Sequence, residues 1–336
     1  MEDQARLFAK SCKVGNDFFV HASPPPHAPQ RGKRVDGRQS RILRRIGGNI
    51  LKRRATVYFP IFFHMYEPCQ GRSGYQADGT IRVRGARPGN GEDMTDLNGK
   101  VALLTGAGGG IGGALADALY AQGAFLILHS DDAAALAARV RDAGWDEARF
   151  ELSGHDVRDS AAVEGAVGRG ITRFGRIDFL INIAGINRFG GILTCTEEEW
   201  DAVASTNVKG YFLTARAIVP HMKEAGSGAI INMSSVWGVR GNPRMMAYSA
   251  SKHAVEGFTK SLREEVAPWG IKVSSLVVGI VDTAFRDAMR DHVRFSDEQC
   301  QRMLTPQDVV DSLLYVLRSS PRALPSSITL EAWLIQ

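Results

Sequence analysis

Short apolar runs alternate with longer segments of helical periodicity over residues 94–336. The runs have the length of buried strands and are VALLT (101–105), AFLIL (124–128), ARFEL (148–152), IDFLIN (177–182), AIINMS (229–234) and KVSSLVV (272–278). Strands that alternate with helices build a parallel sheet, because each helix returns the chain to the edge where the next strand begins. The pattern predicts an α/β fold, a single doubly wound Rossmann-type parallel sheet with helices on both faces.

Glycines mark the ends of two predicted helices, and a late apolar run supplies a further strand. The helical segments IGGALADALYAQG and AAVEGAVGRGITRFG end at Gly123 and Gly175. Glycine is common there because it readily adopts the left-handed backbone conformation that ends a helix. The run ITLEAWLI (328–335) is predicted to close the sheet. Residues 94–336 are therefore expected to form one domain.

Residues 1–93 differ in composition from the rest of the chain. They contain the proline cluster ASPPPHAP and hold 17 Lys and Arg against 8 Asp and Glu, a balance of +9. The whole-chain totals of 41 and 36 leave 24 and 28 for residues 94–336, a balance of −4. The first segment is predicted to be a basic, mostly disordered extension. It is either a flexible arm or an over-extended reading frame with its true start at Met94, where MTDLNGK looks like an ordinary cytosolic start.

The composition argues against a membrane protein, a metal site and a nucleic-acid partner. The apolar stretch VYFPIFFHMY (57–66) is too short to cross a bilayer and is broken by Pro60. The four cysteines show no CxxC spacing, so no zinc site or disulfide framework is predicted, and a reducing, cytoplasmic setting is expected. Binding of nucleic acid or an anionic membrane by the charge of the basic segment is an alternative, but the segment lacks aromatic interleaving and a recognised nucleic-acid-binding motif.

The stretch VALLTGAGGGIGGALADAL runs from a strand through glycines into an amphipathic helix. Glycines let the backbone approach a pyrophosphate, and the helix directs free N–H groups at that anion. A flexible turn that binds nothing is the alternative, but the flanking strand and helix favour phosphate binding. The stretch matches the pattern TGxxxGxG, and it also matches GxGxxG through Gly108, Gly110 and Gly113, so the spacing alone does not settle the subtype. The predicted cofactor-binding residues of this loop are Thr105, Gly106, Gly110, Ile111 and Gly112.

The second predicted strand is followed by Asp131 and Asp132, with no Lys or Arg. In dinucleotide folds an acid about 20 residues beyond the glycines binds the ribose 2′-hydroxyl, whereas a basic residue accommodates a 2′-phosphate. The cofactor is therefore expected to be NAD or NADP, with NAD favoured. Asp131 is equally suited to cap the following helix.

Tyr248 and Lys252 lie four residues apart and share one face of a predicted helix. An ammonium group near a phenol lowers the phenol pKa, so such a tyrosine can exchange protons with a carbonyl or an alcohol. The alternative is the polar edge of a packed helix. Ser235, thirteen residues upstream, ends a predicted strand, where its hydroxyl can bind an oxygen that gains charge. Asn207 lies further upstream, in STNVKG.

The glycine spacing together with Asn207, Ser235, Tyr248 and Lys252 resembles the short-chain dehydrogenase/reductase family, including members similar to 3-oxoacyl-[acyl-carrier-protein] reductases. The resemblance covers residues 94–336. It implies that Tyr248 is the general acid/base and that Lys252 lowers its pKa and holds the nicotinamide ribose. It also implies that Ser235 orients the substrate oxygen and that Asn207 positions a water.

Further cofactor contacts follow from the same resemblance. Asp156 matches the contact with the adenine ring, and Thr283 matches the carboxamide contact; helix capping is the alternative for both. The family motif NNAG is NIAG here, with Ile183 in place of the second asparagine. Ser130 stands where the family usually has an acid, at the end of the second strand. Val278 stands where the family usually has a proline, in the loop after the sixth strand. The contacts expected from NIAG are Asn182, Ala184 and Gly185.

The predicted function is an NAD(P)-dependent oxidoreductase acting on a small-molecule alcohol, ketone or acyl substrate. A non-catalytic dinucleotide-binding protein of the same fold is the alternative. The resemblance implies a homodimer or homotetramer packed through residues 200–224 and 247–268. Substrate choice is expected to depend on residues 185–191, 236–246 and 280–303.

Overall fold

The computed structural model of the protein describes residues 73–75, 81–83, 96–289 and 292–333. The first two of these segments are strands β1 (Ser73–Tyr75) and β2 (Ile81–Val83), which pair antiparallel. The prediction of disorder for the rest of residues 1–93, and the alternative of a start at Met94, lie outside the described residues.

The main domain contains a seven-stranded sheet in which every pairing is parallel, in the order β5-β4-β3-β6-β7-β8-β9. The strands are β3 (Val101–Thr105), β4 (Phe125–Ser130), β5 (Phe150–Gly154), β6 (Phe179–Asn182), β7 (Gly228–Ser235), β8 (Ile271–Val278) and β9 (Ser327–Leu330). Each of the six predicted apolar runs overlaps one of these strands, which confirms the predicted fold class. β9 is shorter than predicted because its only neighbour, β8, ends at Val278, the residue paired with Leu330.

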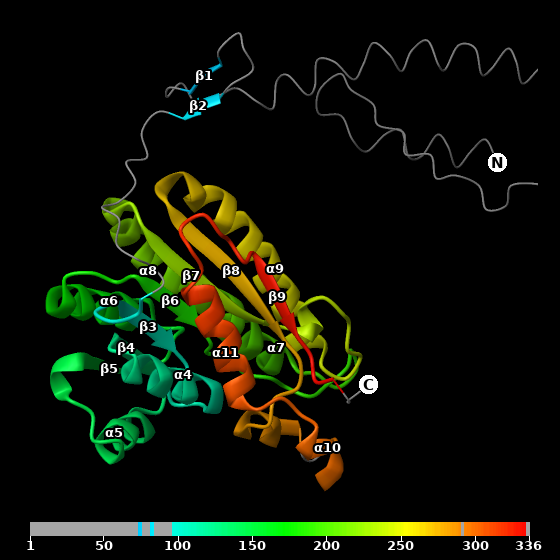
Figure 1. Cartoon of the computed structure of the whole chain (residues 1–336). Coiled ribbons are helices and arrows are strands. Elements are labelled where there is room, and N and C mark those ends of the chain that lie inside the picture. The colour runs from blue at the N-terminus through cyan, green and yellow to red at the C-terminus, as the bar shows by residue number, and fades with distance from the viewer. Residues whose placement is uncertain (1–72, 76–80, 84–95, 290–291, 334–336) are drawn as a thin grey trace, which may run out of the picture. The chain divides into compact units, whose positions relative to one another are not determined.

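Helices cover both faces of the sheet (Figure 1). Successive strand residues pack in two different apolar clusters, one on each face. Leu104 and Leu128 pack in the cluster that includes residues of α4 (Gly110–Ala121), α5 (Ala133–Asp142) and α11 (Pro306–Leu317). Leu103 and Ile127 pack in the cluster that includes residues of α6 (Ser160–Phe174), α8 (Gly210–Ala225) and α9 (Met246–Val266). None of the helices that the structure describes is long and apolar enough to cross a membrane.

The remaining helical segments are short and connect the larger elements. They are η1 (Glu147–Arg149), α7 (Glu197–Ala204), the π-helical turn η2 (Ser205–Lys209), η3 (Val236–Gly238), η4 (Ala267–Trp269), η5 (Ala284–Met289) and α10 (Asp297–Gln301). The predicted helix ends are present, since Gly175 caps α6 with φ of +77° and Gly123 follows α4 with φ of +86°.

The chain reverses its direction of sheet growth at β3. From β3 it adds β4 and β5 on one side, then crosses back to add β6, β7, β8 and β9 on the other. The loops after β3 and β6 therefore diverge at the carboxyl edge of the sheet. In open parallel sheets such a switch point is where ligands bind.

Candidate active site

The glycine loop between β3 and α4 is packed too closely for side chains. Gly106 has φ of +72°, and a Cβ on it would lie 2.8 Å from the Ala184 nitrogen. A Cβ on Gly112 would lie 2.1 Å from the Gly106 carbonyl oxygen. α4 begins with no side chain capping its first turn. The loop thus offers bare backbone and a helix N-terminus, a cradle that fits a pyrophosphate.

Thr283 closes the same loop from the other side of the cleft. A Cβ on Gly110 would lie 2.8 Å from the Thr283 methyl carbon. Within the described part of the chain the Thr283 hydroxyl has no hydrogen-bond partner, while its backbone carbonyl accepts from the Arg286 nitrogen at 3.1 Å. The hydroxyl does not cap η5, so it is free to bind a ligand.

Thr105 and Asn182 lie behind the cleft and use their side chains to join strands. The Thr105 hydroxyl accepts hydrogen bonds from the Ile183 and Ala184 nitrogens at 3.1 and 3.2 Å. Asn182 donates to Asn232 on β7 at 2.9 Å and accepts from the Thr214 hydroxyl at 2.8 Å. Both predicted residues are fully buried and hold the turns that carry the cleft.

The end of β4 presents Ser130 and Asp131 to the cleft. The helix cap is Asp132, whose carboxylate accepts from the Ala135 nitrogen at 2.8 Å, so the alternative capping role for Asp131 is wrong. The Ser130 hydroxyl accepts from the Asp132 nitrogen at 3.3 Å. Asp131 therefore lies in the cleft with its carboxylate available to a ribose.

Asp156 also lines the cleft, but its carboxylate is occupied by Arg158. The Arg158 Nε donates to both carboxylate oxygens, at 2.8 and 3.0 Å, and the Arg158 backbone nitrogen donates at 2.8 Å. These bonds hold the Asp156 pKa below its usual value. The cap of α6 is Asp159, so the capping alternative for Asp156 is wrong.

Tyr248 and Ser235 meet in the cleft from α9 and the end of β7. Burial raises the pKa of the Tyr248 phenol to about 12, and a hydrogen bond with the Ser235 side chain acts in the opposite direction. The sequence predicted a phenol pKa lowered by the Lys252 ammonium. Burial dominates instead, because it penalises the phenolate and the ammonium alike.

Lys252 lies one turn after Tyr248 and is buried. Its ammonium nitrogen donates to the Met233 carbonyl at 2.8 Å, and the Tyr211 hydroxyl donates to the same carbonyl at 3.2 Å. Burial lowers the Lys252 pKa to about 7, and the Glu256 carboxylate on the next turn acts to raise it. Near neutral pH the lysine is poised between its charged and neutral forms.

The Lys252 shift predicts a pH dependence of stability. The folded-state pKa of about 7 lies below the ordinary value of 10.5, so between these values the unfolded chain binds more protons. Stability attributable to this group should rise as pH rises through that range, by at most about 1.4 kcal/mol per pH unit. Urea unfolding of Lys252→Met, across the same pH series, should lack this contribution. Equal pH slopes for the two proteins would contradict the assignment.

Asn207 lies in η2, the π-helical turn between α7 and α8, and is fully buried. Its oxygen accepts from the Ile186 nitrogen at 2.8 Å, and its nitrogen donates to the Ile186 carbonyl at 2.9 Å and to the Ser251 hydroxyl at 3.0 Å. A Cβ on Gly185 would lie 3.1 Å from the Asn207 oxygen. The amide fixes the loop after β6 against α9.

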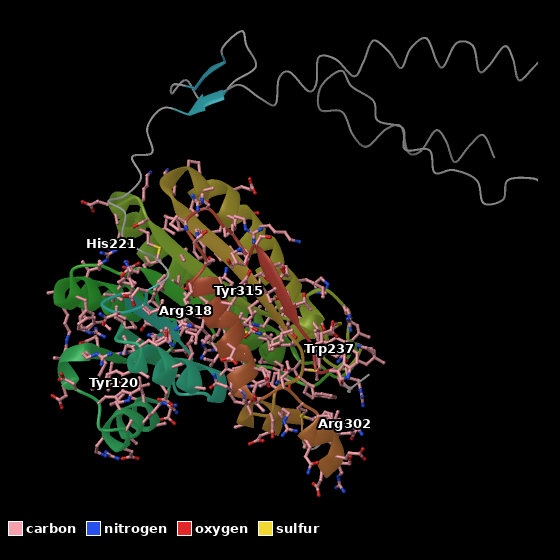
Figure 2. All side chains as sticks on the ribbon, in the orientation of Figure 1. Tyr120, His221, Trp237, Arg302, Tyr315 and Arg318 are labelled. Carbon is pink, nitrogen blue, oxygen red and sulfur yellow. The ribbon has the colours of Figure 1, made fainter. Side chains whose placement is uncertain are left out.

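These elements enclose a cleft of about 890 Å³ at the carboxyl edge of the sheet. The three predicted substrate segments all contribute to its wall. Trp237, labelled in Figure 2, lines the cleft, as does Glu331, the residue that follows β9. Thr105, Asn182 and Asn207 do not line it. The predicted residues that do are Gly106, Gly110, Ile111, Gly112, Asp131, Asp156, Ala184, Gly185, Ser235, Tyr248, Lys252 and Thr283.

The sequence prediction missed two polar residues near the site. His129 lines the cleft, is buried, and has an Nε2 atom with no hydrogen-bond partner among the described residues. The signal for His129 was its position, since it is a polar residue near the end of an otherwise apolar strand. The signal for Tyr211 was its spacing: it follows Asn207 by four residues, so on a helix the two side chains share one face.

The sequence and the fold were compared with known proteins. The family model described as short chain dehydrogenase matches residues 100–294. The short-chain reductase protein NovJ of Streptomyces niveus is 37% identical over 231 residues, which cover 65% of this chain and 87% of that protein.

Solved structures of the same family superpose on the main domain. The 3-ketoacyl-(acyl-carrier-protein) reductase from Brucella melitensis, complexed with NADH, has a TM-score of 0.61 at 28% identity, covering 70% of this chain and 98% of that chain. ElxO with NADP bound has a TM-score of 0.63 at 26% identity, covering 69% of this chain and 97% of that chain.

Proposed function

The chain belongs to the short-chain dehydrogenase/reductase family of oxidoreductases, and on this basis we propose that it transfers a hydride between a nicotinamide cofactor and the carbon of a ketone or secondary alcohol. The supporting observation is that Tyr248, Ser235 and Lys252 share one cleft with the glycine loop. An anion cradle and a proton donor thus lie in one cavity.

In the proposed mechanism the bound nicotinamide supplies or accepts the hydride. Ser235 binds the substrate oxygen, and the Tyr248 hydroxyl delivers the proton to it. With a pKa of about 12, the Tyr248 phenol is protonated throughout the neutral range. The resting phenol therefore carries the proton that reduction of a carbonyl consumes. Asn207 acts by holding the loop after β6.

The end of β4 supports a preference for NADH over NADPH. Asp131 would bind a ribose 2′-hydroxyl and repel a 2′-phosphate. Fluorescence titrations should give a Kd about tenfold lower for NADH, and Asp131→Asn should reduce that ratio. Asp132→Asn is the matched control, because Asp132 caps α5 and should leave the ratio unchanged. Tighter binding of NADPH by the unmodified chain would contradict this assignment.

A panel of aldehydes, ketones and secondary alcohols tests the proposed function. With NADH or NADPH, at least one carbonyl compound should be reduced, as followed by loss of the reduced nicotinamide. A folded protein that binds the cofactor but turns over no member of the panel would favour the non-catalytic alternative.

A homo-oligomer and a cytoplasmic location remain predictions. Trp200 and Phe212, on α7 and α8, expose 40% and 45% of their surface, which supports packing of this region against another copy. Sedimentation of the purified chain measures the assembly.

A further inference from the structure

Two loops meet beyond Tyr248 and form one wall of the cleft. The Gly190 nitrogen donates to the Arg244 carbonyl at 2.8 Å, and the Met246 nitrogen donates to the Gly190 carbonyl at 3.3 Å. The loop after β6 is thereby joined to the segment that leads into α9. Because α9 carries Tyr248, this wall has a fixed relation to the proton donor.

Each loop places an arginine in the wall. Arg188 donates to the neighbouring Asn187 carbonyl at 2.7 Å, and Asn187 donates to the Phe285 carbonyl at 3.1 Å. The Phe285 ring lies 5.9 Å from the Tyr248 ring. The Arg244 guanidinium lies 5.6 Å from the centre of the Phe189 ring. Both arginines line the cleft.

Neither Arg188 nor Arg244 pairs with a carboxylate in the described part of the chain, whereas the other two arginines on this side of the cleft do. Arg240 pairs with Glu331 at 2.7 Å, and Arg286 pairs with Asp282. The other acids that line the cleft, Asp131 and Asp156, follow β4 and β5, on the opposite side of the switch point. The substrate side of the cleft therefore carries two uncompensated positive charges.

We propose that the carbonyl substrate carries an anionic group, a carboxylate or a phosphate, that binds Arg188 and Arg244. The inference rests on the proposed function and specifies its substrate class. Arginine is suited to this task because its planar guanidinium binds either anion through paired N–H groups. Phe189, Phe285 and Trp237 line the same side, so the rest of the substrate is apolar.

Matched substrate pairs test the proposal on the full-length chain. In the first set, each pair consists of an alkyl or aryl oxo acid, which is charged, and its methyl ester, which is neutral. The second is acetoacetyl-coenzyme A and the uncharged acetoacetyl-N-acetylcysteamine. The acid or the coenzyme A ester should be preferred about tenfold in kcat/KM at low ionic strength, and added salt should reduce the preference. A preference for the charged member of the first set identifies the anion as a carboxylate. A preference for the coenzyme A ester in the second set identifies it as a phosphate.

The variant Arg188→Gln/Arg244→Gln should lower kcat/KM for the preferred anion about tenfold and leave its neutral partner within about twofold. The control Arg294→Gln/Arg322→Gln removes the same charge from arginines that do not line the cleft, and should keep the preference. Equal turnover of charged and neutral partners by the unmodified protein, or an equal loss for both in the variant, would overturn the anionic assignment alone. Turnover of no compound would count against the proposed function itself.

Discussion

Replacing Tyr248 with phenylalanine is expected to lower kcat about a thousandfold and leave cofactor affinity within about twofold. The change removes the hydroxyl that donates the proton and keeps the ring. The ring of Tyr248 is buried and lies 5.9 Å from the Phe285 ring, and phenylalanine keeps this ring packing. Turnover should be measured with the best compound of the carbonyl panel, and affinity by titration with NADH.

Tyr211→Phe is the matched control for that variant. Tyr211 is also buried, but it lies on α8, does not line the cleft, and donates to the Met233 carbonyl, which still accepts from Lys252. Its kcat should stay within about threefold of the unmodified protein, since only one neutral hydrogen bond is lost. A Tyr248→Phe variant that kept more than a tenth of the activity would remove Tyr248 from the proposed mechanism.

Replacing Gly112 with alanine is expected to weaken NADH binding at least about a hundredfold and to destabilise the fold by about 1–3 kcal/mol. The added Cβ would lie 2.1 Å from the Gly106 carbonyl oxygen, and because the obstacle is backbone, the loop itself must move. Movement of the loop alters the cradle that fits the pyrophosphate. Titration with NADH and urea unfolding measure the two effects.

Gly168→Ala is the control for the same substitution in a helix. Gly168 lies in α6, where nothing is within 4 Å of an added Cβ. Alanine should stabilise this helix by about 0.5–1 kcal/mol and leave NADH binding unchanged. If Gly112→Ala bound NADH as tightly as Gly168→Ala, the glycine loop would not be the phosphate cradle.

The fold was predictable because its signals are local and repeated. Each parallel strand is buried on both faces, so it appears in the sequence as an unbroken apolar run. β3 has the same bounds as its predicted run, Val101–Thr105. The end of β9 was not predictable, because it is set by where the neighbouring strand β8 stops.

The sequence predicted which residues lie in the site, but it predicted few of the hydrogen bonds that these residues make. The spacing of Tyr248 and Lys252 fixed their common helical face, and both line the cleft. The sequence could not show that Arg158 occupies the Asp156 carboxylate or that Asp132 takes the cap position. It also could not show the shifts in pKa, because these depend on how deeply the surrounding elements bury each group.

The most direct test of the account is a fluorescence titration of the folded, full-length protein with NADH and, separately, NADPH. We expect saturable binding of one cofactor per chain, tighter for NADH, and a Kd for NADH at least about a hundredfold higher in Gly112→Ala. Absence of binding by both cofactors to a protein that unfolds cooperatively in urea would contradict the assignment of the cleft to a nicotinamide dinucleotide.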